Sequence, residues 1–373
     1  MKRIRVTDLF AGVGGFRLGL ERASDRFETV FANQWEPNKK KQWAYECYIS
    51  HWKNHKCICE DINNIDKESL PDFDLLVGGH PCQNFSIGAS TKYAKGLEGT
   101  KGVLWYQIYE ILKIKQPKAF LLENVDRMLK SPSNQRGRDF GIMLYHYNKL
   151  GYKVEWRVVN SANYGSCQRR KRVFVFGFRE SFNPFFNKIF PTKCEYQENE
   201  VLYKLFEDIL NFKFDFKNWG YMEDGEFITK NVEEIQNISG KLADVIQKED
   251  TGKRYLTQEQ IKKFKYLKGS KKLKRVTKEG YEYNYSEGAM AFPDNLDLPS
   301  RTMLTSEGSV NRCSHVVNDN GLRFLTPVEC ERLNSFPDRW TEGMPDRMRY
   351  FCMGNALVVS LIERIGSEIV KII

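Results

Sequence analysis

Short apolar runs alternate with amphipathic stretches through the first half of the chain. The apolar runs have the length of buried strands, and most end at glycine, proline or a polar cluster. These predicted strands span residues 4–10, 29–35, 74–77, 119–123, 153–159 and 172–178. Helical spacing of apolar residues predicts helices over 16–23, 39–48 and 103–113. Because such alternation builds a parallel sheet with helices on both faces, the pattern predicts an α/β fold.

The pattern becomes irregular after about residue 178. Residues 181–250 hold 8 Lys and Arg against 14 Asp and Glu, a net charge of −6, whereas residues 251–280 hold 11 against 2, a net of +9. The basic segment 253–278 also carries Tyr255, Phe264 and Tyr266. A helical pattern over 356–373 closes the chain.

Composition narrows the class of protein. A hydrophobic fraction of 41% and a charged fraction of 28% are ordinary for a globular chain and exclude full disorder. The net charge of +10 suits a partner made of phosphates, although plain surface bias gives the same value. No apolar run has the length of a signal peptide or membrane span, so we expect a soluble intracellular protein. The nine cysteines form no CxxC pattern, which favours reduced thiols over a metal site.

A glycine-rich turn joins the first predicted strand to the first helix. Gly12, Gly14 and Gly15 allow a tight backbone turn that approaches a ligand closely, and a turn without a ligand is the alternative. The segments 34–36 and 60–62 follow at positions that suit a ribose and an adenine; each is alternatively a helix cap or a surface acid. No GxxxxGK[ST] motif is present, which argues against a nucleoside triphosphate.

Three further segments carry candidate chemistry. Cys82 follows a buried strand and a proline, where a nucleophile faces the ligand crevice, but a buried structural cysteine is the alternative. Glu123 ends another strand, where partial desolvation keeps a carboxyl protonated for donation to a ring nitrogen; a charged surface turn is the alternative. The basic cluster 168–172 fits a solvated face, phosphate contacts or a donor to a carbonyl oxygen.

These segments, in this order, resemble the signature motifs of the DNA cytosine-5 methyltransferases, especially those of bacterial restriction-modification systems. The matching segments are 8–16, 78–86, 123–125 and 168–172. Towards the C-terminus, 325–329 and 333–337 resemble the family's penultimate motif, 354–356 its last motif, and 300–303 the Thr-Leu element that ends the target-recognition region. The resemblance covers nearly the whole chain except residues 181–295.

The resemblance implies a class I methyltransferase fold, which is Rossmann-like with a mixed, mostly parallel sheet, and a smaller target-recognition domain. We expect a catalytic and cofactor-binding domain over 1–180, the target-recognition domain over 181–340, and a segment over 341–373 that returns to the catalytic domain. The implied cofactor is S-adenosylmethionine, with S-adenosylhomocysteine as its product and no metal.

The resemblance also assigns roles to residues. Cys82 would attack C6 of cytosine, Glu123 would contact N3 and the exocyclic amino group, and Arg172 would hold O2 with Arg170 beside it. The implied cofactor residues are Phe10, Gly12, Gly14, Gly15, Phe16, Gln34, Trp35, Glu36, Asp61, Ile62, Leu104, Asn355 and Ala356. The implied substrate contacts are Pro81, Gln83, Ser86, Asn124, Gln168 and Thr302.

A few positions depart from the family pattern without removing a catalytic group. Gln34 stands where the ribose-binding residue is usually acidic, and its amide oxygen is still an acceptor for one hydroxyl. His80 stands where Phe or Pro is more usual, and Lys101 where Arg is more common.

The implied partner is double-stranded DNA from which the target base is flipped. Glycines in the loop 87–102 suit closure over that base. We expect the basic segment from 253 up to Thr302 to lie along the DNA, with a solvated helix face as the alternative. We further expect a monomer, in the bacterial cytoplasm on the nucleoid or encoded by a phage, with a cognate restriction endonuclease but no membrane partner.

Two other functions remain open from the sequence. One is an RNA cytosine-5 methyltransferase acting on tRNA, but the long middle region favours DNA. The other is a catalytically silent DNA-binding regulator on the same fold, against which the presence of Cys82, Glu123 and Arg172 argues.

Overall fold

The chain folds into two compact units in the computed structural model, which describes residues 2–53, 57–79, 104–132, 135–193, 201–205, 212–249, 252–277 and 280–373. The large unit contains Met1–Tyr164, Lys171–Asn237 and Val358–Ile373, and the small unit contains Gly165–Arg170 and Ile238–Leu357. These units divide the chain differently from the three expected segments. Residues 181–237 belong to the large unit, because three strands in this range, β8, β9 and β10, extend its sheet.

The described residues of the large unit form a 10-stranded sheet in the order β3-β2-β1-β4-β5-β7-β6-β9-β10-β8. The strands from β3 to β5 pair in parallel, whereas β7 pairs antiparallel with both β5 and β6, and β6 pairs antiparallel with β9. The prediction of a mixed sheet is therefore confirmed. The strands are β1 (Ile4–Leu9), β2 (Phe27–Asn33), β3 (Cys57–Ile58), β4 (Leu75–Gly78), β5 (Ala119–Asn124), β6 (Lys153–Asn160), β7 (Lys171–Phe178), β8 (Tyr203–Lys204), β9 (Trp219–Glu223) and β10 (Glu226–Lys230).

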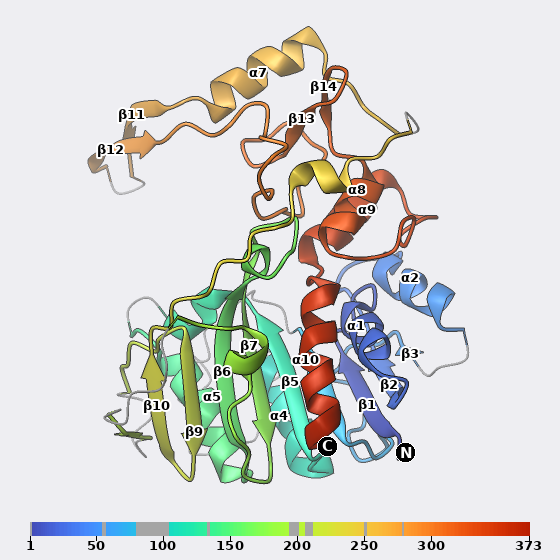
Figure 1. The fold of residues 1–373 in the computed structure, drawn as a ribbon, viewed down its shortest axis with the longest axis vertical. Helices are drawn as coiled ribbons and strands as arrows, with labels where there is room; N and C mark the ends of the chain where they lie inside the picture. The colour runs from blue at the N-terminus through green and yellow to red at the C-terminus, as the bar shows by residue number, and fades with distance from the viewer. Residues whose placement is uncertain are drawn as a thin grey trace. The chain divides into compact units, whose positions relative to one another are not determined.

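Helices cover both faces of this sheet, as the alternation of patterns predicted (Figure 1). Helices α1 and α10 lie side by side on one face, and α4 and α5 lie on the other. The described helices of this unit are α1 (Gly15–Ala23), α2 (Trp43–His51), α4 (Leu104–Lys115), α5 (Arg138–Lys149), α6 (Phe186–Ile189) and α10 (Val359–Ile372). Helix α2 begins later than predicted, at Trp43, and Gln42 before it has φ −97° and ψ 69°, which lie outside the right-handed helical region.

The coverage of both faces explains the apolar strands. Every residue of β4 is buried, and so are all but one of β5, so these strands carry no alternating polar face. Helix α10 packs closely against α1 at the position of Gly19. A Cβ on Gly19 would lie 2.5 Å from the Cβ of Ile362, so only glycine permits this approach.

The small unit has its own small core. Phe264, Val316 and Phe324 are buried together, and Leu256, Phe292, Val310 and Leu322 pack against them. Helix α7 (Gln258–Lys268) starts at a capping box in which Thr257 and Gln260 bond each other's backbone. The other elements are β11 (Lys271–Val276), β12 (Glu282–Glu287), β13 (Val316–Asn318), β14 (Leu322–Phe324), α8 (Pro327–Leu333) and α9 (Asp346–Asn355). The basic segment is therefore a helix followed by one strand of a β11–β12 ribbon.

Among the helices that the structure describes, none is both long and apolar enough to cross a bilayer. Within the same part of the chain, no three His, Cys, Asp or Glu side chains gather in a way that would hold a metal ion.

Candidate active site

The carboxyl ends of β4 and β5 form the centre of the candidate site. Gly78 is in register with Leu122 on the neighbouring strand, so the residues that follow each strand lie side by side. A Cβ on Gly79 would lie 3.2 Å from Oε2 of Glu123. Residues 80–103 lie outside the described residues, and with them the predicted contacts Pro81, Cys82, Gln83 and Ser86 and the loop 87–102. The segment that carries Cys82 thus begins beside Glu123.

Glu123 forms an ion pair with Arg172. The Nε atom of Arg172 lies 2.7 Å from Oε1 of Glu123, and their side chains are only 16% and 12% exposed. The pair follows from the antiparallel insertion of β7 beside β5, which places Asn124 opposite Val173. Two predicted catalytic residues are therefore together: an acid and a rigid donor at one sheet edge. Neighbouring Asn124 is buried, and its Oδ1 accepts a hydrogen bond from the backbone of Val125 at 2.8 Å.

The glycine turn lies at the carboxyl end of β1. Phe10, Gly12 and Gly14 all have positive φ values, of 54°, 57° and 89°. The side-chain oxygen of Gln34 accepts a hydrogen bond from the backbone N–H of Gly12 at 2.7 Å. Gln34, which stands where the family usually has an acidic residue, therefore stabilises the turn through this hydrogen bond. The two glycines differ in surroundings: a Cβ on Gly12 would have no atom within 4 Å, whereas one on Gly14 would lie 2.3 Å from the ring of Trp52.

Asp8, just before this turn, is a buried acid that the sequence reasoning did not assign to the site. It is fully buried, and neither carboxylate oxygen has a hydrogen-bond partner among the described residues. Burial raises the pKa of Asp8 to about 8, although the charge of Arg17 acts in the opposite direction. The signal that pointed to Glu123, an acid at the end of an apolar strand, applies equally to Asp8. A buried carboxyl group just before the turn, without a hydrogen-bond partner among the described residues, is a candidate contact for a ligand.

The ends of β2 and β3 add polar groups beside the turn. The Nδ2 atom of Asn33 donates to the backbone oxygen of Glu60 at 2.9 Å, which ties the two predicted nucleoside segments together. Trp35 is 37% exposed. Burial raises the pKa of Glu36, although Lys39 lowers it, and Oε2 of Glu36 has no hydrogen-bond partner among the described residues. The Oδ1 atom of Asp61 accepts from the backbone and the amide of Asn63, at 3.0 and 2.7 Å.

The remaining predicted cofactor residues have mainly packing environments. Phe16 is 4% exposed in the first turn of α1, which Gly15 begins, and Ile62 is 2% exposed and packs in the main apolar cluster. Leu104 is half-buried at the start of α4. Asn355 and Ala356 end α9 in the small unit, where the backbone N–H of Ala356 donates to Cys352.

The basic cluster 168–172 divides between the two units. Gln168 is fully buried in the small unit, where its amide donates to Oδ1 of Asn334 at 2.9 Å and accepts from the backbone of Met303 at 2.9 Å. Arg170 is 1% exposed and donates to the backbone oxygens of Met303 and Gly354, at 3.2 and 2.9 Å. Both side chains therefore hold the 300–303 segment, and Thr302 donates to the backbone oxygen of Arg169 at 2.6 Å.

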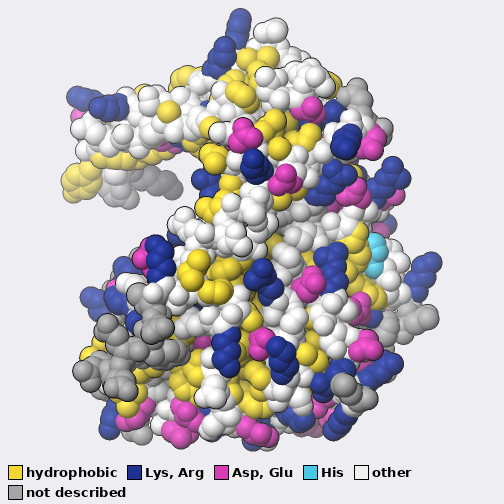
Figure 2. Space-filling view, viewed as in Figure 1, with side chains coloured by type: hydrophobic (Ala, Val, Ile, Leu, Met, Phe, Trp, Pro, Cys, Tyr) yellow, Lys and Arg dark blue, Asp and Glu magenta, His cyan; other side chains and the backbone are white. Residues whose placement is uncertain are grey.

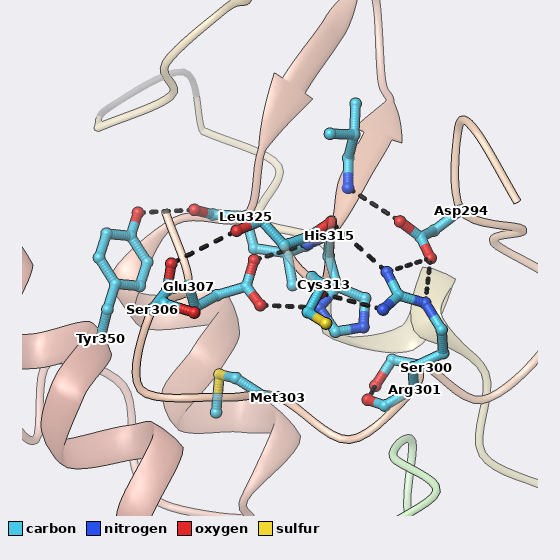
Figure 3. Close-up of polar contacts among 12 residues, drawn as sticks. Asp294, Ser300, Arg301, Met303, Ser306, Glu307, Cys313, His315, Leu325 and Tyr350 are labelled. Atoms are coloured by element: carbon cyan, nitrogen blue, oxygen red, sulfur yellow. Dashed lines mark hydrogen bonds and ion pairs between the residues drawn. The ribbon is translucent and has the colours of Figure 1, made fainter. Parts of the chain in front are cut away.

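Arg301 of this segment belongs to a buried polar cluster (Figure 3). Asp294 accepts from Arg301 at 2.9 Å and from Nζ of Lys268 at 3.1 Å. His315 belongs to the same cluster, and its Nδ1 atom lies 2.9 Å from Oε2 of Glu307. Asp294 thus joins helix α7 to the segment that contains Thr302, and sequence reasoning did not single it out.

Comparisons with known proteins agree with this geometry. The family model of the C-5 cytosine-specific DNA methylases matches residues 4–371. The Type II methyltransferase M.Sau3AI of Staphylococcus aureus is 48% identical over 398 residues, which cover 100% of this chain and 97% of that protein. The Type II methyltransferase M.HaeII of Haemophilus aegyptius is 31% identical over 376 residues, which cover 100% and 94%.

Solved structures agree on the fold. The structure of the S. pombe Dnmt2 methyltransferase aligns with a TM-score of 0.65 over 99% of both chains, at 15% sequence identity. The match of the family model over nearly the whole chain, together with the full-length relatives, decides the family. The chain belongs to the C-5 cytosine-specific DNA methylases.

Proposed function

We propose that this protein is a sequence-specific DNA cytosine-5 methyltransferase of a restriction-modification system. It transfers a methyl group to C5 of a flipped-out cytosine while Cys82 is bonded to C6. The observation that carries this proposal is the pair formed by Glu123 and Arg172, with Nε and Oε1 2.7 Å apart, beside the point where the Cys82 segment begins. The large unit supplies the chemistry and the small unit supplies target recognition.

The pair matches one edge of a cytosine base. O2, N3 and the exocyclic amino group of cytosine follow one another along that edge. A guanidinium donates to O2, and the neighbouring carboxyl contacts N3 and the amino group. Because Arg172 and Glu123 come from adjacent strands, each holds the other in place before a base enters. A base read in this way must leave the DNA stack, so base flipping is part of the proposal.

The chemistry of C5 explains why a nucleophile is needed. C5 of free cytosine is a poor nucleophile. The Cys82 thiolate adds to C6 while N3 receives a proton from Glu123, and the resulting enamine makes C5 nucleophilic. After the methyl group has moved to C5, water accepts the C5 proton, and the electrons of the broken C5–H bond re-form the C5–C6 double bond. The electrons of the broken C6–S bond return to Cys82 as a thiolate, and N3 returns its proton to Glu123.

The residues at the ends of β1, β2 and β3 fit S-adenosylmethionine. When bound, this group supplies an electrophilic methyl group on a sulfonium. Asp8, which has no hydrogen-bond partner among the described residues, offers a buried carboxyl group for the methionine part near the Gly12–Gly15 turn, and Phe16 is buried in the first turn of α1. Glu36 offers a buried oxygen for the ribose, Trp35 an aromatic face, and Asp61 an acceptor for the adenine amino group. Leu104 and Ile62 complete the proposed cofactor residues of the large unit, and Asn355 and Ala356 are the proposed cofactor residues of the small unit.

Other residues have supporting roles in this proposal. Pro81, Gln83 and Ser86 flank the nucleophile and contact the DNA, and Asn124 shapes the turn after Glu123. Arg170, Gln168 and Thr302 position the recognition segment through the contacts they make inside the small unit. The protein acts as a monomer on DNA in a bacterial cytoplasm. A restriction endonuclease that cuts the same site is its functional counterpart, and no metal takes part.

A covalent trap tests the proposal. The protein is incubated with S-adenosylmethionine and DNA that contains 5-fluorocytosine, and the products are separated on a denaturing gel. Fluorine does not leave as a proton does, so the enzyme stalls with its thiol bonded to C6. We expect an adduct with wild-type protein and none with Cys82→Ala, while S-adenosylmethionine binding persists in both.

The trap also distinguishes the two other functions. An adduct on RNA but not on DNA would identify an RNA methyltransferase. DNA binding without any adduct on either nucleic acid would identify a silent regulator. Either result overturns the proposal.

A further inference from the structure

The β11–β12 ribbon of the small unit has two faces of different character. Its strands pair antiparallel, with Lys274 opposite Asn284 and Leu273 opposite Tyr285. Because side chains alternate along a strand, directly opposed residues share a face. One face therefore carries Lys271, Leu273, Arg275, Tyr283, Tyr285 and Glu287, and we name it the inner face. The other carries Lys272, Lys274, Asn284 and Ser286, with Val276 and Glu282 at its far end, and we name it the outer face.

The charged side chains of the inner face make contacts within the small unit, whereas Leu273 and Tyr283 on the same face are exposed. Glu287 lies 3.4 Å from Nζ of Lys271 and 3.2 Å from the guanidinium of Arg312. The guanidinium of Arg275 stacks 3.6 Å above the ring centre of Tyr285. On the inner face, Lys271 is therefore paired with an acid and Arg275 with an aromatic ring, so both cations are less available to a binding partner.

The outer face is free of such contacts. Lys272, Lys274, Asn284 and Ser286 are all exposed. Within the described part of the chain, none of these four side chains has a hydrogen bond or ion pair. Lys and Arg side chains stand out from both α7 and the ribbon in the space-filling view (Figure 2). Two unpaired lysines flanking an amide and a hydroxyl form a surface with donors for anions and for base edges.

A two-stranded ribbon has the right width for one nucleic-acid surface. The major groove of B-DNA admits a two-stranded β-ribbon, and each base pair presents a distinct donor and acceptor pattern there. We infer, on the basis of the proposed function, that the β11–β12 ribbon enters the major groove with its outer face towards the bases. Lys272 and Lys274 contact phosphates or guanine edges, and Asn284 reads a base.

The chemistry of Asn284 specifies which base. A side-chain amide presents one donor and one acceptor side by side, which matches N7 and the N6 amino group of adenine. Asn284 lies between Glu282 and Ser286 along β12, directly opposite Lys274. Asn284 is therefore assigned to an adenine of the recognition sequence. Lys271 lies in the same basic run but on the inner face, so it is not among the DNA contacts.

Salt dependence of DNA binding tests the outer face. We compare wild-type protein with the double variant Lys272→Glu/Lys274→Glu, and with the control Lys2→Glu/Lys113→Glu, which makes the same charge change. Both control residues are exposed on the large unit, Lys2 before β1 and Lys113 near the end of α4. The slope of log K against log salt should fall by about two in the outer-face variant and stay unchanged in the control. Equal slopes in both variants would overturn the inference.

Modified DNA tests the reading of adenine. Wild-type protein first methylates plasmid DNA, and sequencing of 5-methylcytosine gives the recognition sequence. Each adenine of a duplex with that sequence is then replaced by 7-deazaadenine, which lacks the N7 acceptor in the major groove. We expect one position at which kcat/KM of wild-type protein falls by about 10- to 100-fold. The variant Asn284→Ala should show a similar loss on unmodified DNA and no further loss on that duplex.

The results separate this inference from the function on which it rests. A wild-type protein that methylates no cytosine refutes the proposed function. A wild-type protein that methylates DNA, with an Asn284→Ala variant that responds to every 7-deazaadenine as wild type does, refutes only the reading by the ribbon. Unchanged thermal unfolding and unchanged S-adenosylmethionine affinity in each variant show that an altered result comes from the DNA contact.

Discussion

The guanidinium of Arg172 and the carboxylate of Glu123 form one ion pair, 2.7 Å apart, across neighbouring antiparallel strands. Strand β7 is the first antiparallel neighbour of the parallel part of the sheet, and Arg172 lies near its start. The reversal brings the start of β7 to the edge where β5 ends, so a donor from one strand meets an acid from the other. A sheet that stayed parallel would place the start of its next strand at the opposite edge.

This pair predicts a coupled loss of activity. Glu123→Gln keeps the shape but removes the acid, and Arg172→Ala removes its partner. Each should lower kcat by about 100- to 10,000-fold, the usual contribution of a positioned proton donor. The double variant should lose much less than the product of the two losses, because each single change already breaks the shared unit. Single-turnover methylation of a duplex measures all three.

Affinity for S-adenosylmethionine serves as the control for these variants, since the proposed function assigns Glu123 and Arg172 to the base and not to the cofactor. Fully multiplicative losses in the double variant would show that the two side chains act independently, in contradiction to a shared role at one base edge.

The glycine turn provides a matched pair of substitutions. Gly12→Ala and Gly14→Ala make the same change two residues apart, and both add about 1 kcal/mol of backbone strain at positive φ. A Cβ at Gly12 meets open space, so Gly12→Ala should fold and lose S-adenosylmethionine affinity. A Cβ at Gly14 meets the ring of Trp52 at 2.3 Å, so Gly14→Ala should lose more unfolding free energy. Calorimetric titration and thermal unfolding distinguish the two; equal affinity losses would place the cofactor elsewhere.

Six strands and most helices of the large unit were predictable, because burial on both faces makes a strand a continuous apolar run. Strands β3, β8, β9 and β10 were not predicted. Strands β3 and β8 are two residues long, and β10, towards the end of the sheet, has only one buried residue. The candidate site was predictable wherever a polar residue ends such a run, as at Glu123. Asp8 shows the same signal, but its burial without a partner is a tertiary property.

The lysines of the basic segment could not be distinguished from one another by the sequence alone. Lys271, Lys272 and Lys274 are equivalent in the sequence, and a charge count treats them alike. The register of β11 with β12 separates them: Lys271 pairs with Glu287, whereas Lys272 and Lys274 share the opposite face with Asn284. The pairing partner of a strand, and with it the direction of each side chain, depends on residues distant in the chain.

Asp8 predicts a pH dependence of stability. Burial raises the pKa of Asp8 from 3.8 to about 8, and Arg17 only partly opposes this shift. The folded state therefore holds a proton that the unfolded state releases above about pH 4. Its contribution to stability is complete below the unfolded pKa and is lost as the pH rises to 8, at about 1 kcal/mol per pH unit. Asp8→Asn should flatten this slope and raise stability at pH 8, as measured by urea unfolding at a series of pH values.

Asp25, which is exposed just before β2 of the same sheet, offers the control Asp25→Asn. This variant should keep the wild-type slope. A wild-type unfolding free energy that rises between pH 5 and 8, with Asp8→Asn unchanged from it, would show that Asp8 is ionised in the folded protein.

Asp294 predicts the opposite pH dependence, because it is buried among cations. Burial alone would raise its pKa, but His315, Lys268 and Arg301 together hold the pKa of Asp294 below its usual value. Its stabilising effect is therefore present above the unfolded pKa, near 4, and is lost as the pH falls through the lower folded value. Asp294→Asn leaves Lys268 buried without its counter-charge, which should cost about 3 kcal/mol at pH 7. Asp297→Asn, three residues away and with a side chain 83% exposed, should cost almost nothing. Unfolding curves that coincide for the two variants would show that the cluster is held by packing and not by charge.

Because Asp294 joins α7 to the segment with Thr302, its loss should also weaken DNA binding without changing S-adenosylmethionine affinity.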